Sequence, residues 1–113
     1  MIRTLLTTTA SVVAAAAAFA DGHFQPAVIY DMGGKFDKSF NESAYNGAEA
    51  FKADTGVEYL DFEITDPSQR ESVLREFAEL GANPIGVMGF AQADAMAAVA
   101  PEFPDTNFSI IDV

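Results

Sequence analysis

Residues 26–44 read PAVIYDMGGKFDKSFNESA and combine an apolar run, a glycine-rich segment and the start of an amphipathic pattern. The run Pro26–Asp31 is short, apolar and polar only at its end, which is typical of a buried strand. The segment Met32–Ser39 is rich in glycine and charge and is interpreted as a loop. Ser39 and Glu42 fit a capping box, in which two side chains satisfy free amides of the first helical turn. The stretch therefore predicts a strand, a loop and a helix.

The helix predicted after this loop has one apolar face. Its stripe at helical spacing consists of Phe40, Ala44, Ala48 and Phe51. The helix is expected to continue to about Asp54. Gly56 is expected to end it, because glycine readily adopts the left-handed conformation common at helix ends. The chain thus predicts a strand–helix unit that can pack on a sheet.

Strand and helix patterns alternate through the rest of the chain. Asp66 and Pro67 are expected to open the second helix as its cap and first residue. Its apolar stripe consists of Val73, Leu74, Phe77 and Leu80, and Gly81 ends it. The other predicted elements are strands at Val57–Ile64, Pro84–Met88 and Asn107–Val113, and a third helix at Ala91–Ala100. The order βαβαβαβ predicts an α/β fold with a parallel sheet covered on both faces.

The composition narrows the range of functions. The chain has 113 residues, 17 of them acidic and 6 basic, and a net charge of −11. Because such a charge repels phosphate backbones, nucleic-acid binding is disfavoured. Without cysteine there is no disulfide, no thiolate nucleophile and no lipid-modified N-terminal cysteine. His23, the only histidine, lies in the N-terminal tail and is expected to face solvent rather than to bind a metal or catalyse a reaction.

The first twenty residues, Met1–Ala20, resemble a secretory signal peptide. Arg3 supplies the positive start, an alanine-rich apolar centre follows, and the end Ala18-Phe19-Ala20 has the small-x-small pattern of a cleavage site. A membrane-spanning helix is the alternative, but threonines interrupt the run and it falls short of the ~20 apolar residues that a span needs. We therefore expect the mature chain to begin at Asp21 and to be exported, as a soluble protein, to a bacterial periplasm.

Polar or unusual residues follow three of the predicted strands. They are Asp31 after the first strand, Gly89 and Phe90 after the third, and Asp112 after the fourth. Phe40 and Asn41, in the first turn of the first helix, are expected at the same edge. In an open parallel sheet, ligands bind at the carboxyl ends of the strands. Each residue also has a purely structural interpretation: the two aspartates can end strands in water, Phe40 can pack in the core, and Asn41 can be solvated.

Enzyme motifs are largely missing. The chain contains no phosphate-binding GxxxxGK[ST] loop, no GxGxxG fingerprint and no GxSxG elbow. No paired histidines suggest zinc, so neither a metal nor a cofactor is expected. Asp31 after the first strand faintly resembles the nucleophile of an aspartyl phosphatase. Such an enzyme would need a second aspartate where Gly33 stands, so this alternative is disfavoured.

Residues 31–44, DMGGKFDKSFNESA, resemble the opening motif of the basic membrane protein family, the solute-binding proteins of ABC importers. The family pattern is D-x-G-x-x-x-D-x-S-F-N, followed by a glycine that Gly47 matches. Two later segments agree: IGVMGF at 85–90 with the family's strand-to-turn segment, and PDTNFSIID at 104–112 with its P-x-x-x-F-x-x-x-D strand. The resemblance covers residues 26–113 and corresponds to the N-terminal part of a full family member.

The resemblance implies a type I periplasmic-binding-protein fold, in which two α/β lobes close on a ligand. Residues 21–113 would then be the N-terminal part of an incomplete first lobe. The resemblance further implies a monomeric receptor without enzymatic activity, which passes a purine nucleoside to an ABC permease in the inner membrane. Matched to the family's motif, the ligand-binding positions are Asp31, Phe40, Asn41 and Asp112, with Gly89 and Phe90 as a pocket-lining turn.

Two other functions stay open from the sequence. The same fold can bind a different solute, such as a sugar, a lipid or another small metabolite. An exported phosphatase-like enzyme that uses Asp31 is the alternative of a different class. It would depend on Mg²⁺ and turn over a phosphoester.

Overall fold

Four short strands form one parallel sheet with the spatial order β2-β1-β3-β4. Their bounds are Ala27–Tyr30 for β1, Leu60–Glu63 for β2, Ile85–Met88 for β3 and Phe108–Ile111 for β4. In the register, Ile29 on β1 lies opposite Phe62 on one side and Val87 on the other. The parallel α/β sheet expected from the alternating pattern is confirmed.

The computed structural model describes residues 24–112. The expected signal peptide Met1–Ala20, its cleavage before Asp21 and the expected exposure of His23 lie outside these residues. Within the described range, no helix is long and apolar enough to cross a membrane.

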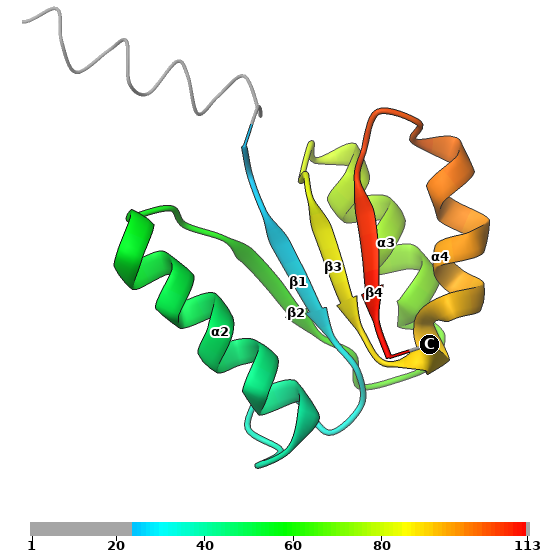
Figure 1. Cartoon of the computed structure of the whole chain (residues 1–113). Helices are drawn as coiled ribbons and strands as arrows, with labels where there is room; N and C mark the ends of the chain where they lie inside the picture. The colour runs from blue at the N-terminus through cyan, green and yellow to red at the C-terminus, as the bar shows by residue number, and fades with distance from the viewer. Residues whose placement is uncertain (1–23, 113) are drawn as a thin grey trace, which may run out of the picture.

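Helices lie on both faces of the sheet (Figure 1). α2, Phe40–Thr55, packs on one face, and α3, Gln69–Glu79, lies beside α4, Ala93–Val99, on the other. Two short 3-10 turns flank α4, η1 at Phe90–Gln92 and η2 at Ala100–Glu102. This two-sided cover is what a parallel sheet needs, because both of its faces are apolar.

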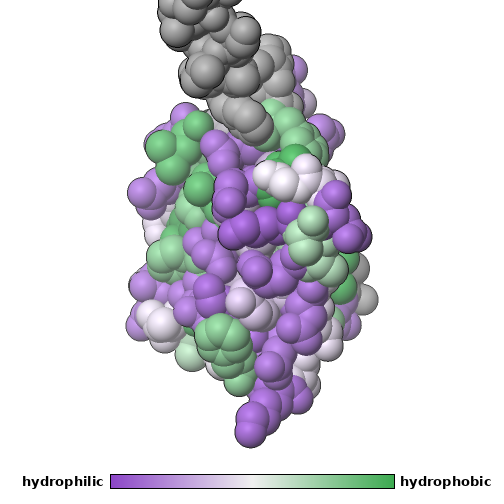
Figure 2. Space-filling view, turned by 90° about the vertical axis from the view of Figure 1, so that its left-hand side faces the viewer, coloured by the Kyte–Doolittle hydropathy of each residue, from purple (hydrophilic) through white to green (hydrophobic). Residues whose placement is uncertain are grey.

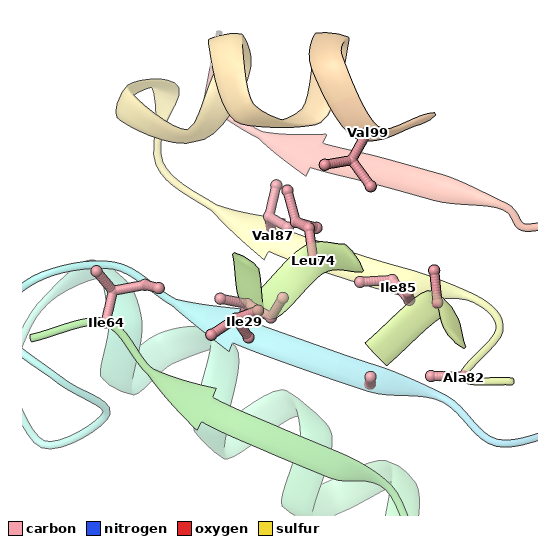
Figure 3. Packing of buried hydrophobic residues seen from close by; sticks show 10 residues of the cluster. Ile29, Ile64, Leu74, Ala82, Ile85, Val87 and Val99 are labelled. Carbon is pink, nitrogen blue, oxygen red and sulfur yellow. The ribbon is translucent and has the colours of Figure 1, made fainter. Parts of the chain in front are cut away.

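The main hydrophobic core lies between the sheet and the α3–α4 layer (Figure 3). Ile29 and Val87 point from the two central strands towards Leu74 of α3, and Val99 closes the layer from α4. All four side chains are completely buried. β1 and β3 are therefore held at the centre of the fold, and the segments that follow them are fixed in space.

The start of α2 differs from the predicted capping box. Ser39 is the N-cap residue, but its hydroxyl makes no capping bond. The carboxylate of Asp37 does this instead: Oδ1 accepts from the amides of Ser39 and Glu42, and Oδ2 accepts from the amide of Asn41. Two oxygens serve three amides, so the aspartate satisfies more free donors than the serine hydroxyl can. At the other end Gly56 is left-handed, with φ of 73°, and ends the helix as predicted.

Several other bounds are corrected. β2 begins only at Leu60, so Val57 to Tyr59, which the prediction included, lie outside the strand, and β4 ends at Ile111. α3 begins at Gln69, after a turn in which Asp66 Oδ1 accepts from the Ser68 amide. Leu80 follows α3 and is 68% exposed, so it does not belong to the buried stripe. The third predicted helix is a 3-10 turn, a short α-helix and a second 3-10 turn. The α-helix stops before Pro101, which lacks the amide that would continue it.

Candidate functional site

The carboxyl ends of β1, β3 and β4 meet at one edge of the sheet. Asp31 follows β1, and Gly89 follows β3 with φ of 99°. A β-carbon at Gly89 would lie 3.3 Å from Asp31 Oδ2, so the backbone of this turn runs directly beside the carboxylate. The Gly89 amide donates to the carbonyl of Ile111 at 2.9 Å, which brings the end of β4 to the same place. Three segments far apart in the sequence thus form one small polar rim.

The Asp31 carboxylate has a charged partner that was not predicted. Arg70, in the first turn of α3, donates to Oδ1 from Nε at 3.1 Å and from Nη2 at 3.0 Å. The Arg70 and Asp31 side chains are 20% and 19% exposed, so solvent screens the pair only partly. The negative charge at the end of β1 is therefore compensated by a cation from another element.

Asn41 ties the end of β1 to the start of α2. Its Oδ1 accepts from the Asp31 amide at 3.3 Å, and its Nδ2 donates to the Asp31 carbonyl at 3.0 Å and to the Met32 carbonyl at 3.5 Å. The residue is only 3% exposed. Its amide thus fixes the backbone that carries the Asp31 carboxylate.

Asp37 stabilises the same loop. Partial desolvation works against its charge, but hydrogen bonds from the backbone amides of Glu42, Ser39 and Asn41 outweigh it and hold the pKa of this carboxyl below its usual value. Asp37 therefore stays ionised at neutral pH as the cap of α2, and it is not a free acid or base.

Phe40 lies at the mouth of an apolar groove. The groove has a volume of about 580 Å³ and runs between α2 and the sheet. Phe40, Met88 and Ile111 line it at the carboxyl ends of the strands, whereas Phe24 and Pro84 line it at the amino ends. Phe40 is 40% exposed, so it offers an accessible aromatic surface at the same edge of the sheet as the polar rim. Figure 2, viewed from the left-hand side of Figure 1, shows hydrophilic side chains interspersed with separate hydrophobic patches.

The two remaining predicted site residues are exposed. Phe90 begins η1 directly after Gly89 and is 69% exposed. Asp112 follows β4 with φ of 72°, a left-handed conformation that aspartate tolerates better than most residues. Both belong to the segments that meet Asp31 at the sheet edge, and neither side chain is buried in the hydrophobic core.

Two further polar residues, Gln92 and Lys35, join neighbouring segments close to the site. Gln92 is completely buried, and its Nε2 donates to the carbonyls of Ile29 and Met88, which joins β1 to β3 just before their ends. Lys35 joins the loop after β1 to β2: its Nζ bonds Asp61 at 2.9 Å and its amide donates to Glu63. The hydrogen bond to Asp61 raises the pKa of Lys35. These hydrogen bonds tie β1 and the loop after it to the neighbouring strands β3 and β2, next to the polar rim.

Sequence reasoning missed Arg70 and Gln92 as parts of this region, and it placed Lys35 in the loop at this edge without its partners Asp61 and Glu63. For Arg70 a signal was present: the first turn of a helix that follows a parallel strand lies at the carboxyl edge of the sheet. An arginine at that place, in a chain with only 6 basic residues, is a natural partner for an aspartate at the same edge. The contacts of Gln92 and Lys35 depend on tertiary packing and have no comparable local signal.

Residues 24–113 match the family model described as ABC transporter substrate-binding protein, PnrA-like. The chain is 39% identical over 90 residues to an uncharacterized lipoprotein of Pyrococcus furiosus, covering 76% of this chain and 22% of that protein. It is 29% identical to the ABC transporter nucleoside-binding protein BmpA of Lactococcus lactis, covering 76% and 26%. The chain thus spans about a quarter of the length of these relatives.

A solved structure agrees with the sequence comparisons. A solute-binding protein of an ABC transporter system from Aeropyrum pernix superimposes with a TM-score of 0.74 at 30% identity. The match covers 80% of this chain and 25% of that one. The four-stranded sheet with its helices therefore has the periplasmic-binding-protein fold.

Proposed function

The chain belongs to the family of PnrA-like ABC transporter substrate-binding proteins, and we propose that it binds a purine nucleoside for import. Proteins of this family bind solutes for transporters and are not enzymes. The phosphatase-like alternative with Asp31 as nucleophile is therefore set aside. In the proposed role, the protein delivers its ligand to an ABC permease of the inner membrane.

The observation that carries the proposal is that Asp31 and Gly89 lie side by side at the carboxyl edge of the sheet, the edge at which Phe40 begins α2 and lines the groove with Met88 and Ile111. A purine presents a flat π-face that can stack on Phe40. Its edge and its ribose present N–H and O–H donors that a carboxylate accepts. The relative from Lactococcus lactis is named as nucleoside-binding, which supports this ligand class.

The proposed ligand-binding residues are Asp31, Phe40, Asn41, Gly89, Phe90 and Asp112. Because the amide of Asn41 bonds the backbone at Asp31 and Met32, its part in this proposal is to hold the site in shape. Phe90 and Asp112 are exposed and are therefore accessible to a ligand. Residues 21–113 are proposed to be the N-terminal part of the first lobe, working as a monomer in the periplasm.

A titration with inosine, followed by amide chemical shifts in NMR spectra of the chain, tests the ligand and the site together. We expect saturable shifts at Asp31, Phe40 and Gly89 with weak affinity, because a type I receptor holds its ligand between two lobes and these residues belong to one of them. Replacing Phe40 by alanine is expected to weaken inosine binding about five- to 150-fold, because stacking on an aromatic ring contributes about 1–3 kcal/mol per base.

Phe51→Ala is the matched control. Phe51 lies on the same helix, lines the same groove and is similarly exposed at 37%, but it is three turns away from the rim. It is expected to leave inosine affinity unchanged. Equal losses of affinity in the two variants would contradict stacking of the base on Phe40. Saturable shifts with ribose or a short fatty acid but none with inosine would overturn the nucleoside assignment in favour of the sugar, lipid or other metabolite alternative.

A further inference from the structure

We propose that Arg70 is a positioning residue that sets the charge class of the ligand. By compensating Asp31, it makes the rim a site for neutral solutes that donate hydrogen bonds and not for cations. This inference rests on the proposed function, because it concerns the same site. Arg70 lies outside the motif that identifies the family resemblance, on a helix that begins 38 residues after Asp31.

The geometry of the pair is asymmetric. Both Nε and Nη2 of Arg70 donate to Oδ1 of Asp31, at 3.1 Å and 3.0 Å, whereas Oδ2 receives only one longer bond of 3.4 Å from Nη2. Oδ1 is therefore occupied by two donors, and Oδ2 retains more of its accepting capacity. Oδ2 is also the oxygen beside the Gly89 turn, 3.3 Å from where a β-carbon would stand. The available oxygen is the one nearest the turn proposed to line the pocket.

Glu71, the residue next to Arg70 on α3, bonds a different arginine, Arg75, at 2.9 Å. Arg75 is also bonded to Glu102 at 2.7 Å. Within residues 24–112, the hydrogen bonds of the Arg70 guanidinium all go to Asp31. The charges of Arg70 and Asp31 therefore largely cancel, and Asp112 is the remaining acid among the proposed ligand-binding residues.

This arrangement decides what the carboxylate can recognise. An uncompensated carboxylate attracts cationic ligands by its charge, and a partly desolvated one does so strongly. A carboxylate paired with a fixed arginine has little net charge, but its second oxygen still accepts a hydrogen bond. A hydroxyl of a sugar or a ring N–H of a base matches such an acceptor. A phosphate does not, because it offers no donor and would meet Asp112 as a second acid.

The test compares adenosine with two cationic analogues in NMR titrations of the full chain at pH 7. The analogues are 5′-amino-5′-deoxyadenosine, charged on the ribose, and 1-methyladenosine, charged on the base. In the wild type we expect adenosine to bind at least as tightly as either analogue. In Arg70→Met we expect adenosine to bind about tenfold more weakly, and the preference for at least one cation to rise about tenfold.

Two variants separate charge from packing. Arg70→Lys restores the charge without the two-donor hold on Oδ1, so adenosine affinity should be intermediate and the preference among ligands close to the wild type. Arg75→Met removes an arginine from the same helix that bonds Glu71 and Glu102, and should leave both quantities unchanged. If Arg70→Met does not fold, as judged from loss of amide shift dispersion, Arg70→Gln replaces it, because glutamine keeps a donor and removes the charge.

The outcomes distinguish the two proposals. If the wild type shows no saturable shifts with adenosine or inosine, the proposed function fails and the role of Arg70 falls with it. If the wild type binds adenosine and the Arg70 variant lacking the charge keeps both the affinity and the preference, only the inference about Arg70 is overturned. A loss of adenosine affinity without any change in preference also contradicts it, because a merely structural role predicts that result.

Discussion

Replacing Asn41 by alanine is expected to lower the free energy of unfolding by about 2–4 kcal/mol. The side chain is 3% exposed and bonds the amide and carbonyl of Asp31 and the carbonyl of Met32. Alanine removes these bonds and leaves partly buried backbone groups without partners, which costs more than the bonds themselves contribute. Chemical denaturation followed by circular dichroism measures the change.

Asn46→Ala provides the control for this prediction. Asn46 is the other asparagine of α2 and is exposed, so its replacement should change the unfolding free energy by less than about 0.5 kcal/mol. In Asn41→Ala, inosine binding should also weaken, because Asp31 is no longer held. An Asn41 variant as stable as the Asn46 variant would show that the amide does not organise the end of β1.

The second large effect is expected in the core, where Leu74→Ala should cost about 2–5 kcal/mol of unfolding free energy. Leu74 is completely buried between α3 and the central strands β1 and β3. Shortening it removes apolar contacts and leaves a cavity that the sheet cannot collapse to fill. Because the same α3 carries Arg70, the substitution should also disturb the Arg70–Asp31 pair.

Leu80→Ala is the matched control, since it is the same substitution on a leucine that is 68% exposed just after α3. It should change stability by less than about 0.5 kcal/mol. Thermal and urea unfolding of both variants measure the difference. Similar losses for Leu74 and Leu80 would contradict the assignment of the α3–α4 layer as the main core.

The sheet and its helices could be predicted from the sequence because their signals are local. Apolar runs ended by polar residues, such as the one before Asp31, coincide with β1 and β3, and Gly56 ends α2 as its left-handed φ requires. The alternating order then allows few topologies. Element ends were harder to place, since Asp37 rather than Ser39 caps α2. A capping pattern in the sequence does not tell which of two nearby acceptors reaches the amides.

The candidate site was only partly accessible to sequence reasoning. That strand ends meet at one edge follows from topology, and Asp31 and Gly89 do lie together there. The bonds of Arg70 to Asp31 and of Gln92 to two strand carbonyls depend on how α3 and η1 pack against the sheet. No spacing within the sequence encodes those distances. For the same reason, the burial of Asn41 could not be distinguished from the solvated position that a first helical turn often has.

The position of a bound nucleoside on the chain decides whether the carboxyl edge of the sheet is the binding site. Intermolecular NOEs between inosine and the protein measure it. We predict contacts from the base protons to the Phe40 ring and to the Gly89–Phe90 turn, at the carboxyl ends of the strands. Contacts confined to Phe24, Pro26 and Pro84 at the opposite end of the groove, or no contacts at a saturating inosine concentration, would contradict it.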